Sequence, residues 1–200
     1  PRSNTAVMSP GPWRSCSSEA TACCSGDACV RLPGALQWLL TASDVPPMSH
    51  LFSPLQLGPV SLPNRIVIAP MCQYSADNGQ AGSWHGMHYG QLAQSGAGLM
   101  IVEATAVQAN GRISWADTGL WDADCQAAWQ PVLAGIRQWS AMPLGIQLAH
   151  AGRKASCDVP WQGGAQLAPE DPRGWQTVSA SGQPYAAHEC APQALDPAGI

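Results

Sequence analysis

The sequence predicts an α/β fold: the amino-terminal part of a (β/α)₈ TIM barrel, entered by a β-hairpin and incomplete. From residue 48 on, short apolar runs alternate with amphipathic segments, which is typical of strands joined by right-handed helical crossovers. No Gly-x-Gly-x-x-Gly motif follows a strand, so a dinucleotide-binding Rossmann half is disfavoured. The 200 residues are fewer than the roughly 250 of a whole barrel, and we interpret the chain as a fragment.

Residues 1–47 differ from the rest. They mix Ser, Cys, Pro, Gly and Ala without a helical or strand period. The apolar patch at 32–41 resembles a weak secretory core, but no small-residue cleavage pattern follows it. We expect residues 1–47 to be a disordered leader outside any domain, and residues 48–200 to be the barrel portion.

The first elements after Met48 are a hairpin and a strand. Short alternating runs flank Gly58-Pro59, which predicts a hairpin over 54–63. The continuous apolar run at 65–71 suits a strand covered on both faces. Pro70 should end that strand because proline has no backbone N–H, and residues 75–83 should form a loop.

Two helices and two further strands follow. Ser83 is expected to cap a helix that ends near Gly96 and Gly98. Four of its residues should face the protein interior: Trp84, Met87, His88 and Leu92. A strand at 99–107 and a loop at 108–121 come next.

Asp122 should cap the second helix, whose apolar positions follow one face: Cys125, Ala128, Trp129, Val132, Leu133 and Ile136. Pro131 should kink this helix or split it in two. A third strand is expected at 144–150, and no element is predicted from there to residue 199.

Charge and cysteine usage limit the partners and the compartment. The net charge is −4, and the sequence shows no basic face that would indicate nucleic-acid binding. We also expect no membrane association. None of the eight cysteines shows the paired spacing of a zinc site. Cys72, Cys125, Cys157 and Cys190 are scattered singly, which favours a reducing compartment, the cytoplasm.

Candidate functional residues lie where the predicted strands end. In a parallel barrel the catalytic and ligand-binding side chains lie at or just beyond the carboxyl ends of the strands. This rule selects residues 70–74, 103–105 and 147–153. A thiol, a phenol, an amide and small residues meet there. No carboxylate pair for glycoside chemistry and no Ser/His/Asp arrangement is present among them. This set suits a flat polar heterocycle laid against backbone.

Each candidate also has a structural interpretation. Cys72 could be a small buried apolar residue, and Tyr74 a loop phenol with a hydrated tip. Gln147, inside an apolar strand, requires a ligand or a structural hydrogen bond. Glu103 could be a base, but we favour an ion pair with Arg65 or Arg153.

The histidines raise a metal-site alternative. His85 and His88 lie about one helical turn apart, and His150 ends a strand. As three ligands they would suit a metal-dependent TIM-barrel hydrolase. Packing of both helical histidines, with His150 closing its loop, is the interpretation we favour, and we predict no metal site.

Four motifs in order resemble the old yellow enzyme family, flavin-dependent ene reductases on a (β/α)₈ barrel. The motifs occupy 64–74, 102–107, 111–113 and 145–155, and the resemblance covers roughly residues 50–195. Cys72 and Ala104 resemble the thermophilic-like class that includes the xenobiotic reductases.

The resemblance implies a set of FMN-binding residues: Ala69, Pro70, Met71, Cys72, Ala104 and Gln147. It implies catalytic roles for Cys72, near the flavin ring, and for Tyr74, in the substrate pocket. NADPH or NADH would reduce FMN, and hydride would pass from the reduced flavin to the C=C bond of an enone or enal.

The same resemblance implies that the full-length form is a homo-oligomer. The histidine pair that binds the carbonyl, the proton-donating tyrosine and the flavin-binding arginines of the family lie on later strands. We therefore expect that the isolated chain neither folds stably nor binds FMN well. A catalytically inactive truncated remnant is the alternative.

Overall fold

The computed structural model describes residues 49–199. The predicted leader at 1–47 and its apolar patch lie outside the described residues. Within 49–199, a short hairpin precedes a three-stranded parallel sheet whose crossovers are two α-helices. None of the helices in this part of the chain is long and apolar enough to cross a membrane.

The hairpin forms as predicted. After a 3₁₀ turn at His50–Phe52, strand β1 (Leu55–Leu57) pairs antiparallel with β2 (Val60–Leu62). Gly58 has a φ of +55°, a conformation that glycine adopts without steric cost.

The central sheet has the order β3-β4-β5, with all strands parallel. Its strands are β3 (Val67–Ile68), β4 (Leu99–Ala106) and β5 (Leu144–Ala149). Strand β3 is much shorter than the predicted 65–71: only its two residues pair with β4, and Pro70 cannot donate to a ladder. The register of β4 against β5 shifts between Val102 and Ala104, as at a β-bulge.

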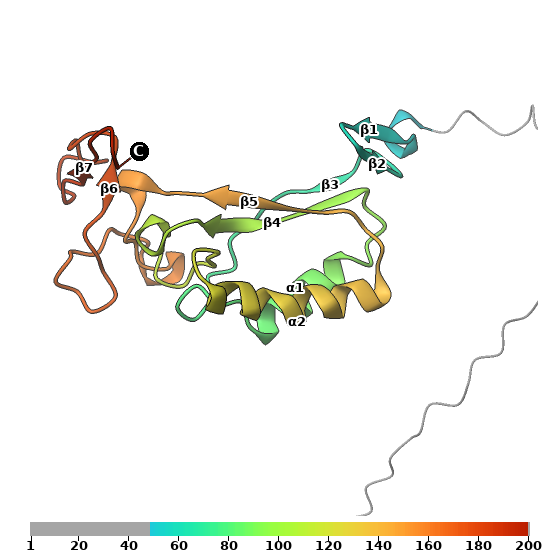
Figure 1. The fold of residues 1–200 in the computed structure, drawn as a ribbon, viewed down its shortest axis with the longest axis horizontal. Coiled ribbons are helices and arrows are strands. Elements are labelled where there is room, and N and C mark those ends of the chain that lie inside the picture. The colour runs from blue at the N-terminus through green and yellow to red at the C-terminus, as the bar shows by residue number, and fades with distance from the viewer. Residues whose placement is uncertain (1–48, 200) are drawn as a thin grey trace, which may run out of the picture. The chain divides into compact units, whose positions relative to one another are not determined.

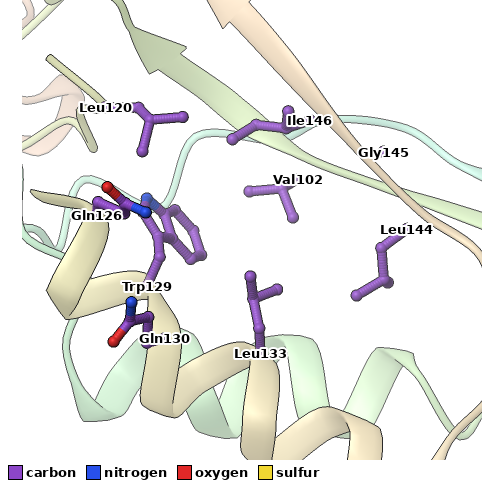
Figure 2. A pocket seen from close by; sticks show the side chains of 9 residues that line it. All are labelled: Val102, Leu120, Gln126, Trp129, Gln130, Leu133, Leu144, Gly145 and Ile146. Carbon is purple, nitrogen blue, oxygen red and sulfur yellow. The ribbon is translucent and has the colours of Figure 1, made fainter.

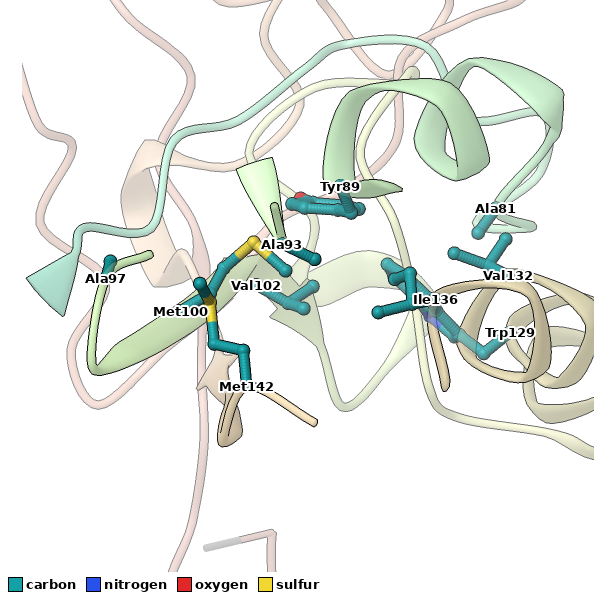
Figure 3. Packing of buried hydrophobic residues seen from close by; sticks show 10 residues of the cluster. All are labelled: Ala81, Tyr89, Ala93, Ala97, Met100, Val102, Trp129, Val132, Ile136 and Met142. Atoms are coloured by element: carbon teal, nitrogen blue, oxygen red, sulfur yellow. The ribbon is translucent and has the colours of Figure 1, made fainter. Parts of the chain in front are cut away.

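Both α-helices cover the same face of this sheet, as Figure 1 shows. Helix α1 spans Ser83–Leu92 and α2 spans Ala123–Trp139. The apolar core between helices and sheet is drawn in Figure 3 and consists of ten buried residues: Ala81, Tyr89, Ala93, Ala97, Met100, Val102, Trp129, Val132, Ile136 and Met142. The two helices and this core therefore support the sheet from one face.

The predicted inward face of α1 is wrong at two of its four positions. Trp84 and Met87 are 46% and 59% exposed, whereas His85 and Tyr89 are buried. The predicted cap is also one residue late, since Gly82 is the N-cap and its N–H donates to Nδ1 of His85. Polar partners on β4, described below, turn the His85–Tyr89 side inward, so hydrophobicity alone does not identify the buried face.

Helix α2 follows the prediction more closely. The Asp122 carboxylate accepts the N–H of Cys125 at 2.8 Å, the geometry of an N-cap. Four of the six predicted positions are buried: Cys125, Trp129, Val132 and Ile136. Pro131 does not split the helix, which continues to Trp139.

The remaining segments contain short elements. A 3₁₀ turn at Ala109–Gly111 lies in the predicted loop. Beyond β5, where no element was predicted, the chain forms two 3₁₀ turns and two very short parallel strands: Gly152–Lys154, Pro160–Gln162, β6 (Val178–Ser179) and β7 (Gln193–Ala194).

Candidate functional site

The carboxyl ends of β3, β4 and β5 bring the predicted flavin-contacting positions together. Ala104 and Gln147 are direct partners across β4 and β5. The backbone N–H of Ala104 lies close enough to the Cys72 sulfur to favour its thiolate form. Residues 72, 104 and 147, far apart in sequence, therefore share one edge of the sheet.

At the carboxyl ends of these strands, the face of the sheet opposite α1 and α2 is uncovered (Figure 1). Gln147 is exposed, and its side chain makes no hydrogen bond to another described residue. Since the amide is not buried, the predicted burial penalty does not arise. Ala69 is exposed, Met71 is 51% exposed and Pro70 is half-buried, so the segment after β3 also presents side chains to solvent.

Cys72 carries a neutral thiol at neutral pH. Burial, reinforced by the negative charges of Asp117 and Glu103, raises the pKa of this half-buried thiol to about 11, although two backbone N–H groups oppose the shift. A thiol in this state is a weak nucleophile, because the thiolate is the reactive form. Its chemistry here is that of a polarisable contact and a weak hydrogen-bond donor.

Tyr74 has a constrained backbone. Its φ of +49° lies in the left-handed region, which is uncommon for a bulky residue. The ring meets Trp161 edge-on, with centroids 5.8 Å apart, and burial raises the pKa of the phenol. Trp161 is 67% exposed and was not singled out from the sequence; no local pattern marks it, because the contact joins two loops.

Glu103 is not paired with arginine, so the predicted ion pair is wrong. Its fully buried carboxylate accepts the Tyr89 hydroxyl at 2.8 Å through Oε1 and the Gln73 N–H at 2.8 Å through Oε2. Arg65 instead donates to the Ser53 hydroxyl at 3.0 Å. Burial raises the pKa of Glu103, and these two donors compensate part of that cost.

The three histidines do not form a metal site. Nδ1 of His85 accepts the Gly82 N–H, and its Nε2 faces Glu103 at 3.5 Å. His150 bonds the N–H of Gly152 through Nδ1. Among residues 49–199, no three His, Cys, Asp or Glu side chains are placed to hold a metal ion, so the hydrolase alternative has no ligand set in the part of the chain that the structure describes.

A separate apolar cavity of about 420 Å³ lies between α2 and the strands β4 and β5 (Figure 2). Its walls include Val102, Trp129, Leu133 and Leu144. Three of these residues belong to or pack against the core on the helix-covered side of the sheet. It is therefore distinct from the uncovered edge that holds Gln147.

The sequence of residues 50–195 matches the NADH:flavin oxidoreductase / NADH oxidase family. The chain belongs to this family. Membership implies FMN as the cofactor and a nicotinamide nucleotide as the reductant, and it confirms the resemblance to the old yellow enzymes.

Individual relatives agree with this assignment. The NADPH dehydrogenase of Listeria monocytogenes is 51% identical over 110 residues, which are 54% of this chain and 32% of the relative. This chain spans about a third of the length of the curated relatives it matches.

Solved structures give the fold. Morphinone reductase in complex with tetrahydroNAD superposes with a TM-score of 0.59 at 28% identity, covering 75% of this chain and 42% of that one. The old yellow enzyme from Trypanosoma cruzi gives 0.57 at 26% identity, covering 74% and 42%. The predicted fold class, part of a (β/α)₈ barrel with an N-terminal hairpin, is thereby confirmed.

Proposed function

We propose that the chain provides part of the active site of an FMN-dependent NAD(P)H oxidoreductase that reduces the C=C bond of enones and enals. The observation that carries the proposal is the meeting of Cys72, Ala104 and Gln147 at the uncovered ends of parallel strands, within a chain that matches a flavin oxidoreductase family. Catalysis at strand carboxyl ends is the rule for barrels.

The residues present fit a flavin. Ala69 and Ala104 have small side chains, which permit a flat ring to approach the backbone. The exposed amide of Gln147 offers a donor and an acceptor beside Ala104, its partner on β4. We propose these contacts, with Pro70 and Met71, as one wall of the FMN site.

FMN, when bound, supplies the hydride chemistry. The side chains of this chain bind and orient the flavin and the substrate. In this proposal Gln147 hydrogen-bonds the pyrimidine side of the ring, Cys72 contacts the ring through a neutral thiol, and Tyr74 borders the substrate. The edge-on contact with Trp161 holds the Tyr74 ring in position, which limits the space left for a substrate.

The binding part of the proposal is tested by titrating the chain with FMN and following flavin fluorescence. We expect saturable binding that is weak, because the described residues contact the ring from one wall only. Gln147→Leu should weaken it by about tenfold, the loss of a bidentate amide contact. Gln91→Leu, on the exposed side of α1, is the matched control. Equal affinities of both variants would contradict the role of Gln147.

The catalytic part is tested by NADPH oxidation with FMN present, with and without 2-cyclohexenone. Enone-dependent oxidation that falls in Tyr74→Phe supports the ene-reductase proposal. Oxidation that the enone never accelerates would favour the inactive remnant instead.

Two further assignments belong to the same proposal. The four described cysteines are free thiols: Cys72, Cys125, Cys157 and Cys190. Free thiols suit a reducing compartment, so we place the enzyme in the cytoplasm. The homo-oligomer implied by the resemblance is testable by sedimentation velocity.

A further inference from the structure

A buried polar cluster lies between the proposed flavin wall and helix α1. It consists of Glu103 on β4 and of His85 and Tyr89 on α1, and is called here the Glu103 cluster. All three side chains are at most 2% exposed, and Tyr89 is also part of the apolar core in Figure 3. A buried carboxylate is costly unless its oxygens are hydrogen-bonded, so each contact matters.

One oxygen of Glu103 is held from the helix. The Tyr89 hydroxyl donates to Oε1 at 2.8 Å and accepts the N–H of Glu103 at 3.1 Å. His85 accepts the Gly82 N–H through Nδ1 at 2.9 Å. Burial, with a smaller contribution from His88, lowers the pKa of His85, so the ring is neutral. Its single proton is then on Nε2, which faces Oε1 at 3.5 Å.

The other oxygen of Glu103 reaches the proposed active site. Oε2 accepts the N–H of Gln73 at 2.8 Å, and Gln73 lies between Cys72 and Tyr74. No backbone ladder holds this segment, because β3 ends at Ile68. Tyr74 nevertheless keeps its unfavourable φ of +49°, so its surroundings must impose that conformation.

We propose that Glu103 is the positioning residue of the Cys72–Tyr74 segment, fixing it through the Gln73 N–H while Tyr89 holds the carboxylate in place. The inference rests on the proposed function, which gives Cys72 and Tyr74 their roles. The Glu103 carboxylate is itself fully buried. It acts through the backbone of the Cys72–Tyr74 segment.

The Glu103 charge also faces the Cys72 thiol. After burial, Asp117 and Glu103 are the two groups that raise the pKa of Cys72. The phenols of Tyr74 and Tyr89, which also interact with this thiol, have raised pKa values and stay neutral. Removing the charge of Glu103 alone should therefore leave more thiolate at a given pH.

Hydrogen exchange of the Gln73 amide tests the positioning role. Glu103→Ala removes the acceptor, and we expect the amide to exchange about fivefold faster or more, equivalent to one net hydrogen bond. Glu103→Gln keeps an oxygen acceptor and should restore protection. Protection unchanged in Glu103→Ala would overturn the proposal. Should that variant fail to fold, Tyr89→Phe takes its place: faster exchange at Gln73 supports the proposal, and unchanged exchange overturns it.

Alkylation of Cys72 by iodoacetamide, read site by site by mass spectrometry at several pH values, tests the charge effect. A lower pKa of the thiol shifts the pH profile of the rate, whereas loss of packing raises the rate at every pH. In Glu103→Gln the rate at pH 8 should rise about threefold, the change in thiolate that half a pKa unit produces. Glu170→Gln, at an exposed carboxylate, is the matched control and should change nothing. A rate equal to that of the control would refute the charge effect.

Both measurements are made on the full chain without FMN, so their failure is distinct from failure of the proposed function. Loss of Gln73 protection in a chain that shows no FMN binding would retain the positioning role and refute the flavin site. Normal FMN binding with unchanged Gln73 exchange would retain the flavin site and refute the positioning role of Glu103.

Discussion

Gly98 lies directly against the backbone of Asn64, at the point where the chain enters β4. A Cβ added there would be 2.3 Å from the Asn64 carbonyl oxygen, and neither backbone can move far because the Gly98 N–H donates to Ile66 at 2.9 Å. At this position glycine is required by close approach, and a positive φ plays no part.

We predict that Gly98→Ala destabilises the chain by about 1–3 kcal/mol, the usual cost of overpacking. Gly86→Ala is the matched control: in helix α1 its new Cβ meets nothing within 4 Å, and alanine should stabilise by about 0.5–1 kcal/mol. Urea denaturation of both variants measures the difference. Equal effects would show that the contact with Asn64 relaxes freely.

At the scale of the element, helix α2 depends on its N-cap. The N–H of Cys125, more than any other group, holds the pKa of Asp122 below its usual range. A carboxylate with a depressed folded-state pKa contributes stability above its unfolded pKa and loses it as pH falls through the folded value.

Asp122→Ala should therefore lower stability most at neutral pH, and the gap from the wild-type chain should close in acid, below about pH 4. Asp122→Asn keeps a neutral acceptor, so its gap from the wild-type chain should be smaller than that of Asp122→Ala by a constant amount and should vary with pH in the same way. Thermal melts between pH 3 and pH 7 measure both. A constant gap in Asp122→Ala would mean that the charge contributes nothing.

Pro131 lies on the exposed side of α2 and lacks the N–H that would bond the carbonyl of Ala127. Replacing it by alanine should stabilise the helix by about 1–3 kcal/mol. Gln130→Ala, the neighbouring exposed position, should stay within about 0.5 kcal/mol of the wild-type chain. Urea midpoints test the pair, and a destabilised Pro131→Ala would mean that proline fits α2 without strain.

At the scale of the whole molecule, β5 is an edge strand of the sheet that residues 49–199 form. Its residues Ile146 and Leu148 are 40% and 60% exposed, and the apolar cavity of Figure 2 opens beside Ile146. An unpaired apolar edge favours association with another edge.

Leu148→Lys should reduce concentration-dependent self-association of the chain, with stability changed by only about 0.5 kcal/mol. Leu57→Lys places the same charge on the hairpin at a similarly exposed leucine and is the control. Sedimentation velocity over a range of concentrations measures the effect. Identical behaviour of the two variants would remove the β5 edge as the cause.

Most of the features that the sequence determined by itself arise from local interactions. The hairpin around Gly58, the cap at Asp122 and the order of strands and helices all follow from turn chemistry, hydrogen bonding within a few residues and hydrophobic period. The positions of Cys72, Ala104 and Gln147 at one edge also followed, because parallel strands end together. Their roles in binding FMN stay predictions.

Tertiary structure alone decided the polar partners and the buried face of α1. Glu103 had two arginines as candidate partners, yet a tyrosine and a backbone N–H hold it. Those partners lie 14 and 30 residues away, and no local pattern ranks one donor above another. Because a buried carboxylate must be satisfied by whatever the fold brings within reach, its requirement turned Tyr89 inward and left Trp84 in solvent.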